Sequence, residues 1–111
     1  MTALLKKVNL DFGDGTPRVL FYDMKAAIQF EDEAKKNVKD FDIAAARDVC
    51  NMATVILKRT DPAITFDKVT ELVNGQNWAD VQKALAQVMG LKLLDGKGNE
   101  IPLGDEAKNP S

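Results

Sequence analysis

Histidine is absent from this chain of 111 residues, and cysteine occurs once, as Cys50. Histidine is the side chain whose ordinary pKa best suits proton transfer near neutral pH, and it is also the most common ligand of transition metals. A structural zinc site needs several cysteine or histidine ligands, which this chain does not have. These absences predict a protein that is not an enzyme, with no catalytic residues and no metal site.

A single cysteine also excludes an internal disulfide, and Cys50 falls among apolar residues at helical spacing. We therefore interpret it as a packed core thiol. The N-terminus has no long apolar stretch like that of a signal peptide, and no segment approaches the roughly 18 to 20 uninterrupted apolar residues that span a bilayer. The expected compartment is a reducing cytoplasm, and we expect no membrane partner.

Loop motifs for phosphate and calcium are missing as well. Glycines cluster around Gly13 and around Gly96, but neither cluster matches a phosphate-binding loop. Residues 95–106 have three side chains at the spacing of a calcium-binding loop, but Lys97 stands where an oxygen ligand belongs and Glu100 where glycine is required. No cofactor is therefore expected.

Charge is nearly balanced, with 15 basic and 17 acidic residues and a formal net charge of −2. Such a balance gives no overall attraction for nucleic acid or for an anionic membrane. With 45% hydrophobic and 29% charged residues the chain has enough apolar surface to fold, and its length suits one domain. These exclusions favour a small soluble domain that acts by binding another protein.

The first patterned segment is typical of a β-hairpin over residues 5–22. Val8, Leu10 and Phe12 alternate with polar residues, which is the period of a half-buried strand. Residues 13–17 provide two glycines and a proline for a turn, and strong strand formers follow at 19–22.

Four helices are predicted next, near residues 24–37, 42–59, 66–74 and 78–89. Apolar residues recur at helical spacing in each of them. Polar residues that can cap the four N-termini are, in order, Asp23, either Asp40 or Asp42, Thr65, and Asn77. The second helix should end at Asp61-Pro62, because the residue before proline is pushed out of the α region, and Gly75 and Gly90 should end the last two helices.

The second helix has a broad apolar stripe. Its members are Ile43, Ala46, Val49, Cys50, Ala53, Ile56 and Leu57, and it is widened by Met52 and Val55. A helix that is apolar over so much of its circumference is either the central element of a core or half of an oligomer interface. The sequence leaves both interpretations open, including a homo-oligomer.

Four residues are the candidates for contact with a partner: Phe30, Met52, Val55 and Trp78. Large aromatic side chains carry much of the binding energy of many interfaces, and Met52 and Val55 extend the apolar stripe. Burial in the core is the competing interpretation. It is favoured for Trp78, which shares a helix face with other apolar residues, and it is as good as partner contact for Phe30.

The C-terminal part of the chain changes character after residue 90. Residues 91–103 contain a glycine-rich turn between two short apolar pieces, which indicates a second short hairpin. Residues 104–111 have too little apolar surface to offset the entropy of ordering them, so we expect a flexible tail. The predicted fold is α+β and mainly α, with one domain over residues 1–103, formed by an N-terminal β-hairpin and a bundle of about four helices.

Several short motifs follow one another in a specific order. A strand pair (10–22) precedes a helix with Phe30 followed by the acidic residues 31–33, and the next helix runs into Lys58-Arg59-Thr60-Asp61-Pro62. Residues 65–72 then contain a threonine, a hydrophobic residue and an acidic residue in succession, followed by Val69 and Leu72. A final amphipathic helix follows at 78–89. Over roughly residues 5 to 90, this order resembles the tail assembly chaperones of long-tailed phages and prophages.

The resemblance implies a non-enzymatic protein of the bacterial host cytoplasm that is absent from the mature virion. It would bind the tape measure protein, keep it soluble and help to recruit tail tube subunits during tail morphogenesis. Members of the family are often made in a short and a frameshift-extended form, and a length of 111 residues suits the short form. A tape measure protein is long and helical, and its apolar stripes aggregate unless they are covered, so capture of one helix by another is the expected mechanism.

A small helical nucleic-acid-binding regulator is the alternative from a different functional class, and another phage morphogenesis adaptor is a further one. The regulator is motivated only by the last two helices, which a short turn at residues 74–76 joins. Trp78 at the start of the would-be recognition helix, followed by Ala79 and Asp80, suits burial better than contact with phosphate.

Overall fold

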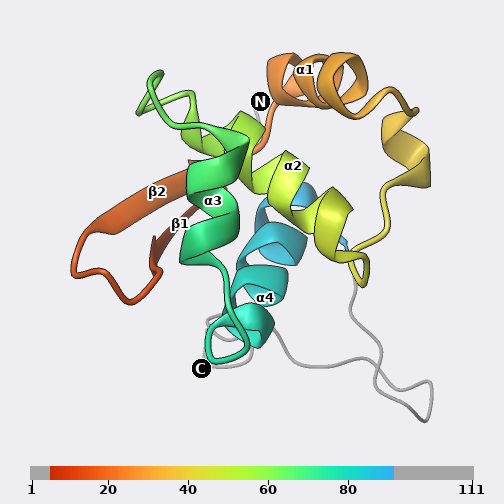
Figure 1. The fold of residues 1–111 in the computed structure, drawn as a ribbon. Coiled ribbons are helices and arrows are strands. Elements are labelled where there is room, and N and C mark those ends of the chain that lie inside the picture. Colours follow the sequence, from red (N-terminus) through yellow and green to blue (C-terminus); the bar gives the residue numbers. More distant parts are fainter. Residues whose placement is uncertain (1–5, 92–111) are drawn as a thin grey trace, which may run out of the picture.

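A computed structural model describes residues 6–91 and confirms the predicted α+β, mainly α, fold (Figure 1). The strands are β1 (Lys7–Asp11) and β2 (Pro17–Phe21). The helices are α1 (Met24–Ala34), the short 3-10 helix η1 (Val38–Asp40), α2 (Ala46–Leu57), α3 (Phe66–Leu72) and α4 (Trp78–Met89). The second hairpin and the tail at 104–111 that the sequence predicts lie outside the described residues.

The hairpin forms because its turn residues supply the conformations that a tight reversal needs. β1 and β2 are antiparallel, with Val8 opposite Leu20 and Asp11 opposite Pro17. Gly13 has φ 99°, in the left-handed region that favours glycine, and its amide donates to Oδ1 of Asp11 over 2.8 Å. The apolar side of the hairpin packs on α4 and α2, which makes it one wall of the core.

Helix α1 starts where the sequence predicts and ends three residues earlier than predicted. Asp23 caps it by accepting a hydrogen bond from the amide of Ala26 over 3.0 Å. The prediction that the helix continues to Asn37 is wrong, because Lys35 adopts the left-handed conformation with φ 59° and closes the helix. The side chain of Asn37 then accepts from the amide of Lys39 over 3.0 Å and starts η1 instead.

Helix α2 starts at Ala46, four residues later than the predicted start at 42. The Oδ1 atom of Asp42 accepts from the amide of Ala44 over 2.9 Å, while the amide of Asp42 donates to Oδ2 of Asp48 over 2.8 Å. These two bonds hold the residues before Ala46 in a turn, and the residue at the cap position, Ala45, has no side-chain cap. Side chains of aspartate compete with the helix for the same backbone groups.

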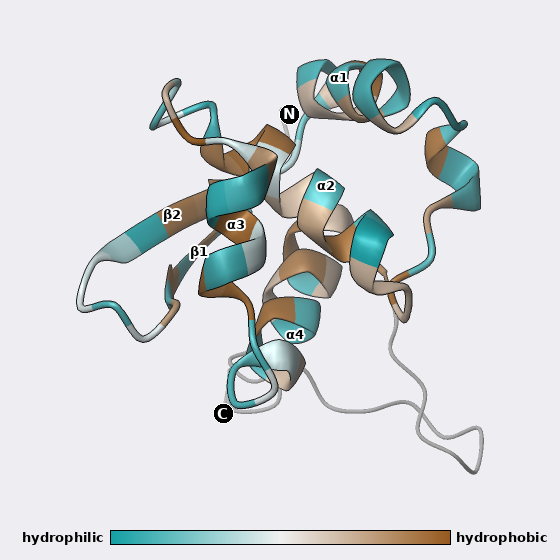
Figure 2. Ribbon diagram, in the orientation of Figure 1, coloured by the Kyte–Doolittle hydropathy of each residue, from teal (hydrophilic) through white to brown (hydrophobic). Residues whose placement is uncertain are grey.

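The broad apolar stripe is explained by the central place of α2 (Figure 1). It contacts β2, α1, α3 and α4, and its buried residues include Val49, Met52, Ala53, Val55, Ile56 and Leu57. Figure 2 shows hydrophobic stretches of β2, α3 and α4 next to α2, whereas α1 is largely hydrophilic on its outer side. Of the two interpretations left open by the sequence, the structure places the stripe from Val49 onward in the core of the domain, whereas Ala46 is exposed and Ile43 is half-buried and lies before the start of α2.

Thr65 and Gly90 act as end signals for the last two helices, whereas the predicted cap of α4, Asn77, makes no side-chain cap bond. The side chain of Thr65 accepts from the amide of Lys68 over 3.1 Å and caps α3, which ends at Leu72, two residues before the predicted end. Helix α4 spans the same residues as the predicted helix and closes at Gly90, which has φ 73°. Among residues 6–91, no helix is both long enough and apolar enough to cross a bilayer.

Candidate functional site

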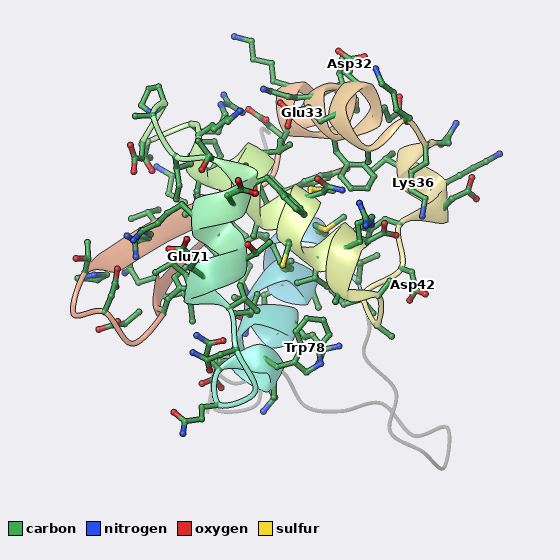
Figure 3. All side chains as sticks on the ribbon, in the orientation of Figure 1. Asp32, Glu33, Lys36, Asp42, Glu71 and Trp78 are labelled. Atoms are coloured by element: carbon green, nitrogen blue, oxygen red, sulfur yellow. The ribbon has the colours of Figure 1, made fainter. Side chains whose placement is uncertain are left out.

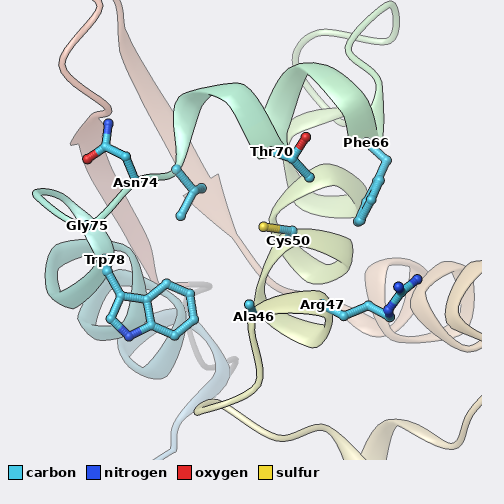
Figure 4. Close-up of a pocket in the computed structure, with 9 residues that line it drawn as sticks. Ala46, Arg47, Cys50, Phe66, Thr70, Asn74, Gly75 and Trp78 are labelled. Atoms are coloured by element: carbon cyan, nitrogen blue, oxygen red, sulfur yellow. The ribbon is translucent and has the colours of Figure 1, made fainter.

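A groove lies where the beginning of α2, one side of α3 and the beginning of α4 meet (Figure 4). Its volume is about 530 Å³. We call it the Trp78 groove, and it is lined by Ala46, Arg47, Cys50, Phe66, Thr70, Val73, Asn74, Gly75 and Trp78. This volume lies within the range of about 300 to 1,000 Å³ that is typical of ligand pockets.

Helical spacing places these side chains on one surface. Ala46 and Cys50 are four residues apart on α2, as are Phe66 and Thr70 on α3, so each pair shares a helix face. Trp78 is the first residue of α4 and follows the loop that contains Gly75. In Figure 4, Phe66 and Trp78 lie on opposite sides of the groove, with Cys50 between them. Two half-buried aromatic rings therefore flank a small, mostly apolar floor.

Among the described residues, Arg47 is the only charged one that lines the groove. Arg47 is exposed, and it makes no hydrogen bond or ion pair with any residue in the described range. The other lining residues are apolar or uncharged. An occupant with apolar side chains and a nearby acidic group would therefore match the chemistry of this groove.

Cys50 has the wrong environment for a nucleophile. Its side chain is buried, and burial raises the pKa of the thiol above its ordinary value. The thiol is therefore protonated at neutral pH, whereas the thiolate is the reactive form. Within residues 6–91, no group of three or more cysteine, aspartate and glutamate side chains is arranged to hold a metal ion. Among the described residues that line the groove, none is suited to acid-base or nucleophilic chemistry, and most of the lining is apolar or uncharged.

The four residues proposed from sequence as partner contacts separate into two groups. Phe30, Met52 and Val55 each have 0% exposure, so their side chains offer no surface to a partner. Phe30 packs edge to face on Phe41, with ring centroids 5.6 Å apart. Trp78 is half-buried and borders the groove. Burial, the competing interpretation for all four, therefore describes the first three, and Trp78 alone lies at a surface where it can be contacted.

Apart from Trp78, no residue of the groove was predicted from the sequence to contact a partner. Cys50 was expected in the core, and Phe66 and Val73 are among the apolar residues that recur at helical spacing in the predicted helix 66–74. Each does pack against the core, but the crossing of α2 and α3 leaves them bordering a depression. The only sequence signal for this depression was a pair of aromatic residues near the starts of two consecutive helices.

A second apolar surface lies on α1. Met24 and Ile28 are 71% and 54% exposed and sit four residues apart on one helix face. They are accompanied by acidic side chains, including Asp32 and Glu33, which Figure 3 shows on α1 and far from Trp78. Glu33 forms an ion pair with Lys58 over 3.6 Å. We call Met24 and Ile28 the α1 patch.

Comparison of the chain with protein-family models, with curated protein sequences and with solved structures found no match.

Proposed function

We propose that this protein is a non-enzymatic tail assembly chaperone of a long-tailed phage or prophage. In this proposal it binds the tape measure protein in the bacterial host cytoplasm, helps to recruit tail tube subunits and is absent from the mature virion. The single observation that carries the proposal is the Trp78 groove, where a half-buried tryptophan borders an apolar surface without catalytic groups. The resemblance in element order supplies the identity of the partner.

The groove suits the capture of an amphipathic helix. Such a helix presents apolar side chains at spacings of three and four residues, and these would enter the space between Phe66 and Trp78. Covering them would keep an unassembled tape measure protein from aggregating. Because the broad stripe of α2 is already used inside the domain, the proposed binding surface is this groove and not α2 as a whole.

The nucleic-acid-binding alternative gains no support from the observed contacts. Trp78, at the start of α4, lies against the domain, and the next two residues are Ala79 and the acidic Asp80. The N-terminal turn of a recognition helix normally presents side chains to bases and phosphates, and an aspartate there repels phosphate. We therefore retain the chaperone as the proposed function.

Co-expression with the tape measure protein of the same phage or prophage tests the proposal. The wild type is expected to keep the tape measure protein soluble and to co-purify with it. Trp78→Ala should lose most of this binding, while the double variant Met24→Ser/Ile28→Ser, which changes the exposed α1 patch, should bind like the wild type. An insoluble tape measure protein in the presence of the wild type would overturn the proposal. Loss of binding in the α1 variant only would show that the groove is the wrong surface.

A further inference from the structure

Arg47, at the rim of the Trp78 groove, is a charged side chain with no partner among the described residues. It is exposed in the first turn of α2. Its neighbour Asp48 is different, because the buried carboxylate of Asp48 forms an ion pair with Lys36. In Figure 4, Arg47 and Trp78 lie on opposite sides of Cys50. The rim that faces Trp78 across the groove is therefore positively charged.

The position of Arg47 gives it no stabilising role in α2. A cation in the first turn of a helix lies at the positive end of the helix dipole, which disfavours it. An exposed side chain without polar contacts also contributes little to the free energy of unfolding. The guanidinium group presents several N–H donors in a plane that matches a carboxylate. Arg47 is therefore available to recognise an acidic group of a partner.

The uncharged polar side chains of the groove do not attract a basic partner. The hydroxyl group of Thr70 donates to the carbonyl oxygen of Asp67 over 2.7 Å. The side-chain oxygen of Asn74 accepts from the amides of Gln76 and Asn77 over 2.8 and 3.1 Å. No carboxylate is among the described residues that line the groove. A basic partner would therefore be repelled at the rim, whereas an acidic partner would be paired there.

We propose that Arg47 selects the occupant of the Trp78 groove, and that this occupant is an amphipathic helix with an acidic side chain beside its apolar stripe. Apolar side chains three or four positions apart would lie between Phe66 and Trp78, and the acidic side chain would lie at the Arg47 rim. The charge pair also fixes the direction of the bound helix, because only one flank of that helix meets Arg47.

The identity of the natural partner rests on the proposed function, in which the helix belongs to the tape measure protein. Selection by charge is a property of the groove itself. The first test therefore uses synthetic peptides and the isolated full chain, so its outcome does not depend on the tape measure protein.

Two peptides of about 20 residues, long enough to form a helix, are compared. They contain the same leucines four positions apart and differ only in one flanking residue, which is glutamate or lysine. Calorimetry and the emission of Trp78, the only tryptophan, measure binding. We expect the glutamate peptide to bind roughly two- to five-fold more tightly at low salt, which is the scale of one exposed ion pair. High salt should reduce this preference, because it screens exposed charges.

Variants at position 47 assign the preference to one side chain. Arg47→Glu should reverse it and Arg47→Gln should remove it, while urea unfolding shows nearly unchanged stability in both. Lys25→Glu is the matched control, because it makes the same change in net charge at an exposed position on α1, and it should keep the preference of the wild type. A merely structural role of Arg47 would lower stability without reversing the preference.

Equal binding of the two peptides to the wild type, or binding of neither, would overturn the proposal. A preference that Lys25→Glu also reverses would do the same, because net charge and not Arg47 would then be its cause. Emission of Trp78 that depends on protein concentration without any peptide would assign the groove to a second copy of the chain and overturn the proposal as well.

Binding of the tape measure protein separates this proposal from the proposed function. If the wild type does not bind the tape measure protein but still prefers the glutamate peptide, the proposed function is wrong and selection by charge remains. If Arg47→Glu binds the tape measure protein as well as the wild type does, while Trp78→Ala does not, the proposed function stands and selection by Arg47 is wrong.

Discussion

The side-chain amide of Asn77 donates to the main-chain carbonyl oxygen of Phe12 over 2.9 Å, although 65 residues separate the two in sequence. The same nitrogen donates to the carbonyl oxygen of Leu72 over 2.8 Å, and the side-chain oxygen accepts from the amide of Asn74 over 2.8 Å. One buried side chain therefore joins the end of β1, the end of α3 and the start of α4. It also fixes the loop from which Trp78 enters the groove.

Replacing Asn77 by alanine should lower the free energy of unfolding by about 1 to 3 kcal/mol, because two buried carbonyl oxygens lose their donor. Urea unfolding followed by circular dichroism measures the change. Gln76→Ala is the matched control, since the side chain of Gln76 is exposed, and it should change stability by less than about 0.5 kcal/mol. Equal stability of the two variants would show that the Asn77 bonds do not hold the three segments together.

Asp48 should hold the turn that precedes α2. Its side chain is 6% exposed, and its carboxylate accepts from the amide of Asp42 over 2.8 Å and forms an ion pair with Lys36 over 2.9 Å. Figure 3 shows Lys36 and Asp42 on the connection between α1 and α2. In Asp48→Ala we expect a loss of about 1 to 3 kcal/mol in unfolding free energy and faster hydrogen exchange of the Asp42 amide. Lys39→Ala, at an exposed position nearby, should leave that exchange rate unchanged.

The pairing of Asp23 with Arg59 should be visible in the pH dependence of stability. The hydrogen bond from Arg59 holds the pKa of the Asp23 carboxyl below its ordinary value of 3.8, and the amide of Ala26 lowers it further. A carboxyl whose pKa is lower in the folded protein stabilises it above the unfolded pKa, and this contribution is lost as the pH falls through the folded pKa. The contribution is small, because the Asp23 side chain is about one third exposed.

In Arg59→Gln, the pKa of Asp23 should move up toward its ordinary value, as an NMR titration of the carboxyl carbon would show. The stability difference between this variant and the wild type should be present at neutral pH and should narrow as the pH falls below about 4. Lys58→Gln, which removes the neighbouring ion pair with Glu33, is the control and should leave the Asp23 titration in place. An unshifted titration in Arg59→Gln would contradict the assigned cause.

Gly90 and Gly75 make a matched pair for testing the end of α4. A Cβ atom added at either position would meet nothing within 4 Å, so the two differ only in backbone conformation. Gly90 has φ 73°, whereas Gly75 is not among the residues with positive φ. Gly90→Ala should therefore cost about 1 to 2 kcal/mol, and Gly75→Ala should leave stability unchanged or slightly higher. Thermal unfolding of both variants checks this, and a destabilised Gly75→Ala would refute the explanation.

Much of the element order could be predicted because its signals are local. Caps such as Asp23 and Thr65, the alternation in β1 and the stop at Gly90 act through hydrogen bonds and backbone preferences within a few residues. The errors at the end of α1 and the start of α2 arose where a side chain contacts a residue several positions away. Glu31 accepts from the amide of Val38, and Asp48 accepts from the amide of Asp42, and helical periodicity contains no sign of either bond.

The hairpin, the four helices and the absence of histidine and of paired cysteines follow from the sequence alone. Which apolar residues remain at a surface depends on how the helices and the hairpin pack together. Met52 and Val55 are buried because the hairpin and the other helices enclose α2, and Phe30 is buried on α1, which packs on α2. Trp78 is half-buried beside a groove. The physical reason is that periodicity fixes the face of a helix on which a side chain lies, whereas the packing of neighbouring elements decides whether that face is covered.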